Sequence, residues 1–119
     1  MHRLREDFIP TLTANEAEAL RELKKKISEV FQNSQLILYG SKARGDFNQD
    51  SDIDILVIAS EPDDHTHRMK LYGLTFEVNM AFMTDFSCRL RNVDNWLRGD
   101  GEYPLFKSSV MEEGIEIEL

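Results

Sequence analysis

The chain has 119 residues, of which 41% are apolar, and its formal net charge is −8. This length and apolar content suit one domain with a single core, over residues 1–119. The acidic balance argues against extended nucleic-acid binding, which relies on a broad basic surface. No apolar run approaches the roughly 20 residues that span a bilayer. The single cysteine allows no internal disulfide, so we expect a cytoplasmic protein without a membrane partner.

The amino-terminal third predicts a helix followed by a strand. Residues 1–10 are expected to be an extended or partly ordered lead-in. Thr13 and Glu16 have the spacing of a capping box. Apolar residues then recur at three- and four-residue steps, which predicts an amphipathic helix from Thr13 onward: Leu20, Leu23, Ile27, Val30 and Phe31. Gln35 to Tyr39 is predicted as a short strand that stops at Gly40.

The Gly40-Ser41 turn is a candidate phosphate-binding element. Glycine lets the backbone approach a ligand closely and adopt positive φ, so backbone N–H groups and the Ser41 hydroxyl could contact an anion. A short helix is expected to begin at Ser41. Either Lys42 or Arg44 could neutralise phosphate charge, and the sequence does not decide between them. A polar loop over residues 45–50 follows.

Ser51 to Ala59 predicts an interior strand, because both of its faces are apolar apart from Asp52 and Asp54. Carboxylates at i and i+2 project from the same face of a strand, about 7 Å apart along the chain. Placing two of them at the start of a buried strand is unfavourable unless something compensates the charge. A divalent metal is the simplest compensation, so Asp52 and Asp54 are candidate metal ligands.

The order strand, Gly-Ser, ten residues, Asp-x-Asp, strand resembles the signature of the nucleotidyltransferase superfamily that includes DNA polymerase beta. The segments GSKARG and SDIDILV are most similar to its small stand-alone bacterial and archaeal members, the minimal nucleotidyltransferases. The resemblance implies an α/β (or α+β) minimal palm, a small mixed sheet with helices mainly on one face. It implies that Asp52 and Asp54 are catalytic and hold Mg²⁺ or Mn²⁺. It also implies four nucleotide-binding residues: Gly40, Ser41, Lys42 and Arg44.

The middle of the chain allows two interpretations. His65 to Tyr72 fits a short crossover helix, or a strand that pairs with the next one through a turn at Gly73. We favour the strand, because a crossover between parallel strands needs roughly a dozen residues or more. Thr75 to Met83 alternates apolar and polar residues and predicts a further strand. Thr84 to Leu97 has an apolar stripe at helical spacing and predicts the closing helix.

In the family, a third metal-binding carboxylate comes from a strand next to the Asp-x-Asp strand. The resemblance implies Glu77 for this role, as metal ligand and as a catalytic group that assists deprotonation of the acceptor. Under an alternative alignment Asn79 takes that position and the third acid is lost. The implied activity is transfer of AMP from ATP to a hydroxyl of a protein or small molecule.

The resemblance also implies a partner. Family members of this size are commonly encoded with a helical HEPN-domain protein, as the antitoxin of a toxin–antitoxin pair. Pro104 is expected to open a last helix, and Tyr103 to Leu119 resembles the family's tail, with a role in packing or partner contact. The sequence also leaves room for a homo-oligomer. The alternative function is a catalytically incomplete module that binds a nucleotide or a partner, and it depends on whether residue 77 or 79 fills the third position.

Overall fold

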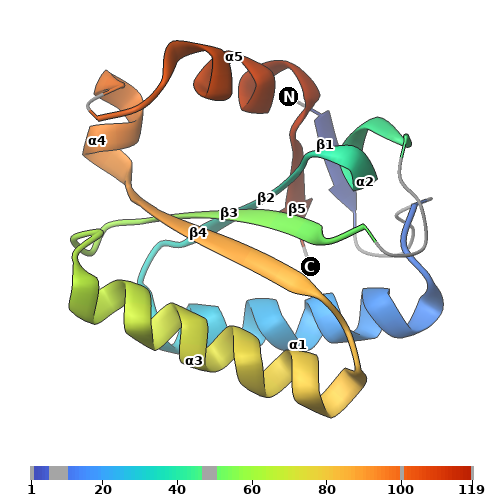
Figure 1. The fold of residues 1–119 in the computed structure, drawn as a ribbon. Helices are drawn as coiled ribbons and strands as arrows, with labels where there is room; N and C mark the ends of the chain where they lie inside the picture. Colours follow the sequence, from blue (N-terminus) through green and yellow to red (C-terminus); the bar gives the residue numbers. More distant parts are fainter. Residues whose placement is uncertain (1, 6–10, 47–50, 100, 119) are drawn as a thin grey trace.

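The computed structural model describes residues 2–5, 11–46, 51–99 and 101–118. They form a five-stranded mixed sheet with helices on both faces (Figure 1). The strand order is β1-β5-β2-β3-β4, from these strands: β1 His2–Arg5, β2 Gln35–Tyr39, β3 Ile53–Ala59, β4 Phe86–Asn92 and β5 Ile115–Glu118. The described helices are α1 Ala14–Val30, α2 Ser41–Arg44, α3 His65–Phe82, α4 Val93–Arg98 and α5 Pro104–Glu113. The predicted α/β fold with a mixed sheet is confirmed.

The middle of the sheet combines both pairing directions. β2 runs antiparallel to both of its neighbours, β3 and β5. β3 and β4 are parallel, with Asp54 opposite Ser87 and Leu56 opposite Arg89. Helix α3 makes the crossover between these two parallel strands, as a parallel pair requires. Strand β1 pairs in parallel with β5 at the other edge.

Helix α1 begins where the sequence predicts. The Thr13 hydroxyl accepts from the Glu16 N–H at 3.1 Å, and the Glu16 carboxylate accepts from the Thr13 N–H at 2.9 Å. This capping box satisfies backbone donors that the first turn leaves free. The helix then buries its apolar side against the sheet: Ala19, Leu20, Leu23 and Ile27.

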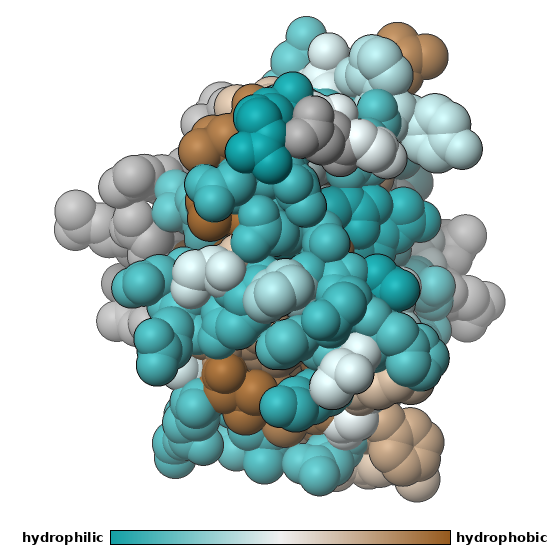
Figure 2. Space-filling view, turned by 90° about the vertical axis from the view of Figure 1, so that its left-hand side faces the viewer, coloured by the Kyte–Doolittle hydropathy of each residue, from teal (hydrophilic) through white to brown (hydrophobic). Residues whose placement is uncertain are grey.

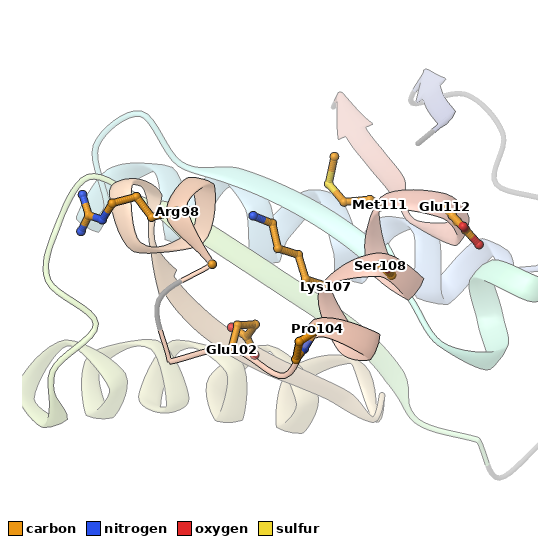
Figure 3. Close-up of a pocket in the computed structure, with 8 residues that line it drawn as sticks. Arg98, Glu102, Pro104, Lys107, Ser108, Met111 and Glu112 are labelled. Atoms are coloured by element: carbon orange, nitrogen blue, oxygen red, sulfur yellow. The ribbon is translucent and has the colours of Figure 1, made fainter.

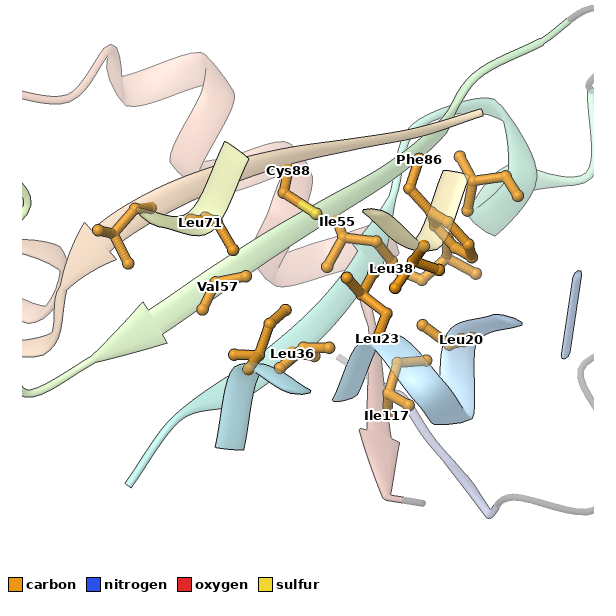
Figure 4. Close-up of a cluster of buried hydrophobic side chains, with 14 of the residues drawn as sticks. Leu20, Leu23, Leu36, Leu38, Ile55, Val57, Leu71, Phe86, Cys88 and Ile117 are labelled. Atoms are coloured by element: carbon orange, nitrogen blue, oxygen red, sulfur yellow. The ribbon is translucent and has the colours of Figure 1, made fainter. Parts of the chain in front are cut away.

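The core has two parts, one on each face of the sheet. Helices α1 and α3 cover one face, where side chains from both helices and from β2, β3 and β4 form the larger cluster (Figure 4). The shorter helices α4 and α5 lie on the other face (Figure 1). They contribute to a smaller cluster there: Ile37, Leu56, Ile58, Trp96 and Val110. The long helices therefore share one face of the sheet. Strand β3 is buried on both of its faces, as its sequence predicts.

The strands predicted over His65–Tyr72 and Thr75–Met83 are wrong. The segment is one continuous helix, α3, of 18 residues, which is long enough for the crossover. Its buried side chains include Leu71, Thr75 and Val78, while Phe76 and Met80 are exposed. Because apolar residues occupy both faces of the helix, they fall at alternate positions and imitate a strand.

The helix predicted over Thr84–Leu97 is also wrong. Phe86, Cys88 and Leu90 are buried on β4 and alternate with exposed positions, which is strand periodicity. The Asn92 side chain then caps α4 by accepting from the Asp94 and Asn95 N–H groups. Cys88 and Trp96 are both buried, so they serve packing.

The outer strands were not expected. Residues 2–5 form β1, whereas the sequence suggested only a lead-in, and 115–118 form β5 between β1 and β2. The remainder of the predicted lead-in, residues 6–10, and positions 47–50 of the predicted polar loop lie outside the described residues. Among the helices described, none combines the length and apolar character needed to cross a bilayer.

Candidate functional site

The two aspartates lie where β3 begins, on the side of the sheet that faces α4 and α5. Ile53 and Ile55 belong to the cluster under α1 and α3, and Leu56 belongs to the cluster on the other side. Side chains alternate along a strand, so Asp54 shares the face of Leu56. Asp54 is half-buried and Asp52, just before the strand, is exposed.

Gly40 is in close contact with Asp54. Its backbone has φ +78° and ψ −155°, a conformation that residues other than glycine rarely adopt. A Cβ atom built on Gly40 would lie 2.5 Å from Asp54 Oδ2. The preceding residue, Tyr39, pairs with Asp54 across the β2–β3 ladder. The Gly-Ser turn therefore lies against a carboxylate of the protein, that of Asp54.

The charge around Asp54 is mixed. Burial is the main cause that raises the pKa of the Asp54 carboxyl, and the nearby charge of Asp52 raises it further. The guanidinium groups of Arg89 and Arg44 act in the opposite direction. The two aspartates therefore repel each other at a site where two arginines already supply positive charge.

Asp85 is a third carboxyl group at this site, and the sequence reading missed it. A hydrogen bond between the Asp85 and Asp52 carboxyl groups is the main cause that raises the pKa of Asp85, followed by burial and the charge of Asp52. The Asp85 carbonyl also accepts from the Ile53 N–H at 3.0 Å, which ties the start of β4 to the start of β3. Recognising β4 as a parallel neighbour of β3 would have pointed to Asp85.

Glu77 lies elsewhere. It is on α3 rather than on a strand, its side chain is 63% exposed, and its carboxylate lies 3.6 Å from Lys26 Nζ on α1. Both helices cover the sheet face opposite to Asp54, so Glu77 is not brought together with Asp52 and Asp54. The expectation that Glu77 sits on the neighbouring strand is wrong, because the whole segment is helical.

Asn79, the alternative to Glu77, has a structural contact instead. Its Nδ2 donates to the Phe86 carbonyl at 3.0 Å, and its Oδ1 accepts from the Phe86 N–H at 2.8 Å. β4 is an edge strand, and the Asn79 amide satisfies both backbone groups at this point of its free edge. Opposite Asp54 in the ladder, β4 itself contributes Ser87, which is not a carboxylate.

The structure distinguishes the two basic residues of the turn. Lys42 is only 4% exposed, and its Nζ lies 3.8 Å from Glu16 Oε1 of α1. Arg44 is exposed and its guanidinium lies beside Asp46, at 3.1 Å, and Glu113, at 3.4 Å. Arg44 therefore faces solvent at the site, whereas Lys42 is enclosed between α2 and α1.

A pocket of about 310 Å³ adjoins the turn. Strand β2, helix α2 and helix α5 line it with these residues: Tyr39, Gly40, Arg44, Leu105, Phe106, Ser109, Val110 and Glu113. The rings of Tyr39 and Phe106 meet edge to face at 5.5 Å, and the Arg89 guanidinium lies 5.3 Å from the Phe106 ring centre. The pocket thus combines an aromatic wall with the guanidinium group of Arg44, and it includes Gly40, which lies against Asp54.

A larger cavity of about 560 Å³ lies between α4 and α5 (Figure 3). Seven of its lining residues are labelled in the figure: Arg98, Glu102, Pro104, Lys107, Ser108, Met111 and Glu112. None of the predicted site residues lines it. Of these two cavities, only the smaller one is lined by predicted site residues, Gly40 and Arg44.

The donor atoms at the site suit a hard cation. Carboxylate oxygens are ligands that Mg²⁺ prefers, and Mg²⁺ is usually held by one or two carboxylates together with substrate phosphates. Among the residues that the structure describes, no group of three or more His, Cys, Asp or Glu side chains could hold a metal ion on its own. The pair Asp52 and Asp54 therefore fits Mg²⁺ shared with a phosphate better than a closed protein cage.

Comparison with known proteins finds a matching family and similar chains. A family model described as a nucleotidyltransferase domain matches residues 20–117. Two similar proteins come from Methanocaldococcus jannaschii, and both are named as inferred protein adenylyltransferases. MJ0141 is 30% identical over 67 residues, which is 55% of this chain and 68% of that protein. MJ0604 is 28% identical over 107 residues, which is 84% of this chain and 95% of that protein.

Solved structures with a similar fold include two of toxin–antitoxin complexes. A mutant of the MntA–HpeT complex matches with a TM-score of 0.56 and 23% identity, over 83% of this chain and 71% of that one. A toxin–antitoxin complex with AMP-PNP matches with a TM-score of 0.59 and 22% identity, over 81% of this chain and 69% of that one. At this identity the likeness concerns the fold.

Proposed function

We propose that this chain, which belongs to the nucleotidyltransferase domain family, transfers AMP from ATP to a hydroxyl group of a protein. One observation carries the proposal. Gly40, at the turn, touches the carboxylate of Asp54, with Asp52 close by and the guanidinium groups of Arg44 and Arg89 on the same side. Such an arrangement can hold a triphosphate beside two metal-binding carboxylates.

Each residue has a distinct role in this proposal. Asp52 and Asp54 hold Mg²⁺ or Mn²⁺, which neutralises charge on the phosphates and on the leaving pyrophosphate. Backbone N–H groups at Gly40 and Ser41 contact the phosphates. Arg44 and Arg89 attract the triphosphate and stabilise negative charge as it develops. Lys42 contributes through its ion pair with α1, which fixes the turn.

The reaction is a displacement at the α-phosphorus. The acceptor oxygen forms a bond to that phosphorus, the bond to the β-phosphate oxygen breaks, and pyrophosphate leaves. The acceptor hydroxyl gives its proton to the carboxylate of Asp85. Asp85 replaces Glu77 as the third carboxyl group of the proposal, because its carboxyl group contacts Asp52.

The choice of ATP and of a protein acceptor is supported by the names of similar proteins. Two relatives are named as inferred protein adenylyltransferases, and one toxin–antitoxin complex with this fold contains AMP-PNP. Together with the resemblance to minimal nucleotidyltransferases, these names support a toxin partner, and we propose that it is a HEPN-domain protein.

A second candidate function is a module that binds the nucleotide without transferring it. One observation favours it: Ser87, rather than a carboxylate, stands opposite Asp54 on the neighbouring strand. In this case Asp52 and Asp54 still hold Mg²⁺ with the nucleotide, but no group transfer follows.

The decisive experiment separates binding from transfer. We would incubate the protein with Mg²⁺ and ATP labelled at the α-phosphate, with and without lysate of its host, and measure binding of Mg²⁺-AMP-PNP by calorimetry. The first function predicts label on a protein acceptor, lost in Asp52→Asn and Asp54→Asn and kept in Asp94→Asn, which changes an aspartate at the start of α4. Binding without labelling would support the second function. Absence of both would refute the site.

A further inference from the structure

Helix α3 carries an apolar stripe on its solvent side. Met69, Tyr72, Phe76 and Met80 follow one another at three- and four-residue steps, so they share one face of the helix. Their exposed fractions are 46%, 42%, 64% and 66%. Leu71, Thr75 and Val78 face the core instead. We call these four exposed residues the α3 stripe.

The surroundings of the α3 stripe continue its apolar character. A groove of about 400 Å³ between α3 and β4 is lined in part by Tyr72, Phe76 and Phe86. Met83, at the C-cap of the helix, is 92% exposed. Most of the molecular face shown in Figure 2 is hydrophilic, with apolar side chains confined to small patches. A row of large apolar side chains along one helix is typical of a contact surface.

Gly73 lies on the same face of the helix as the α3 stripe, four residues after Met69 and three before Phe76. Nothing lies within 4 Å of a Cβ atom built on it, so the packing of this chain does not require glycine there. In a helix interior, glycine is less favourable than alanine. A residue without a side chain does allow the backbone of a second helix to come close, because side chains at the crossing set the distance between helix axes.

The charges beside the stripe indicate what the second helix is. The chain as a whole has a net charge of −8, so two copies repel each other over most of their surface. On α3, Lys70 and Glu77 flank the stripe on one side, three residues before Gly73 and four after it. When two α3 helices cross antiparallel at Gly73, Lys70 of each copy comes opposite Glu77 of the other. The face is thus self-complementary.

We propose that two copies of this chain associate through the α3 stripe, with their α3 helices antiparallel and crossing at Gly73. Contact between helices fits better than pairing between the free edges of β4, because the Asn79 side chain already satisfies the Phe86 backbone groups at that edge. Burial of Phe76 and Met80 drives the association, and the two Lys70–Glu77 pairs set its direction.

The first test uses sedimentation velocity over a concentration series, with matched variants. The wild type is expected to reach the mass of a dimer, and Phe76→Glu to remain a monomer at the same concentrations. Leu97→Glu is the control, because Leu97 on α4 is also exposed, at 71%, but lies outside the stripe. A wild type that stays monomeric throughout, or a Phe76→Glu variant that dimerises like the wild type, would overturn the proposal.

The second test addresses the geometry. Gly73→Ala is expected to raise the melting temperature of a dissociated sample and to weaken dimerisation at least tenfold, so that loss of folding cannot explain the result. Lys70→Glu and Glu77→Lys should each weaken the dimer, and the double variant should restore it. An unchanged dissociation constant for Gly73→Ala, or no recovery in the double variant, would overturn the antiparallel crossing at Gly73.

Discussion

The contact between Gly40 and Asp54 makes Gly40→Ala an informative substitution. A methyl group at this position meets the Asp54 carboxylate, because a Cβ atom would lie 2.5 Å from Oδ2. The φ of +78° adds backbone strain for any residue with a side chain. We expect Gly40→Ala both to destabilise the fold and to displace the carboxylate of Asp54.

The expected magnitude follows from these two effects. The backbone conformation alone costs roughly 1–3 kcal/mol for a residue other than glycine. Gly45→Ala serves as the reference, since Gly45 also has positive φ, +89°, but nothing lies within 4 Å of its Cβ position. Gly40→Ala should lower the free energy of unfolding by about 1–2 kcal/mol more than Gly45→Ala does, because steric overlap with Asp54 forces off-rotamer shifts. The backbone of Gly40, at ψ −155°, also lies outside the left-handed helical region that Gly45 occupies. For a chain of this size each kcal/mol lowers the melting temperature by roughly 3–6 °C.

The assay combines urea unfolding with calorimetric binding of Mg²⁺-AMP-PNP. Gly40→Ala should weaken nucleotide binding at least tenfold, and Gly45→Ala should leave it nearly unchanged. The double variant Gly40→Ala/Asp54→Ala removes the carboxylate and should recover the part of the additional loss that steric overlap causes. Equal destabilisation by the two glycine variants, with no coupling between positions 40 and 54, would refute the reasoning from the close contact.

Three further predictions concern the corrected site. Asp54→Asn should raise the melting temperature in the absence of divalent metal, because it removes a half-buried charge and its repulsion with Asp52, while Mg²⁺-AMP-PNP binding is lost; a lower melting temperature would contradict this account. Glu77→Gln should change nucleotide binding less than twofold, since Glu77 pairs with Lys26 on the other side of the sheet. A loss of nucleotide binding as large as that of Asp54→Asn would show that Glu77 does belong to the site. Asn79→Ala should lower the free energy of unfolding by about 1–3 kcal/mol and increase aggregation measured by light scattering, because the Phe86 backbone groups lose their partner; unchanged stability would show that water replaces the amide.

The first half of the fold could be predicted because its signals are local. The capping box at Thr13 and the strand ending at Gly40 each depend on a few neighbouring residues. The two aspartates could be identified from strand periodicity, since β3 is apolar on both faces around them. These patterns depend on which side chains of an element are buried, and this is what periodicity reports.

The segment 65–97 could not be predicted because α3 has two apolar faces. One face packs on the sheet, and the other is the exposed stripe around Phe76, so the helical period of apolar residues disappears. Gly73 then suggested a hairpin turn, although it lies within the helix. With α3 assigned to strands, the sequence pattern predicts a closing helix over β4 and places Glu77, rather than Asp85, beside the two aspartates. A single helix thus accounts for the errors in both fold and site.

The position of β5 between β1 and β2 has a consequence for the order of folding. Its pairings join Ile115 to His2 and Ile117 to Leu36, so they close the longest loops in the sheet, whereas β2 and β3 are joined by a short connection. Long loops lose more entropy on closure, and their contacts generally form late. The β2–β3–β4 unit with α1 and α3 is therefore expected to form first, with β5 inserted afterwards. Weakening the buried Ile117 should then mainly accelerate unfolding, leaving the folding rate nearly unchanged.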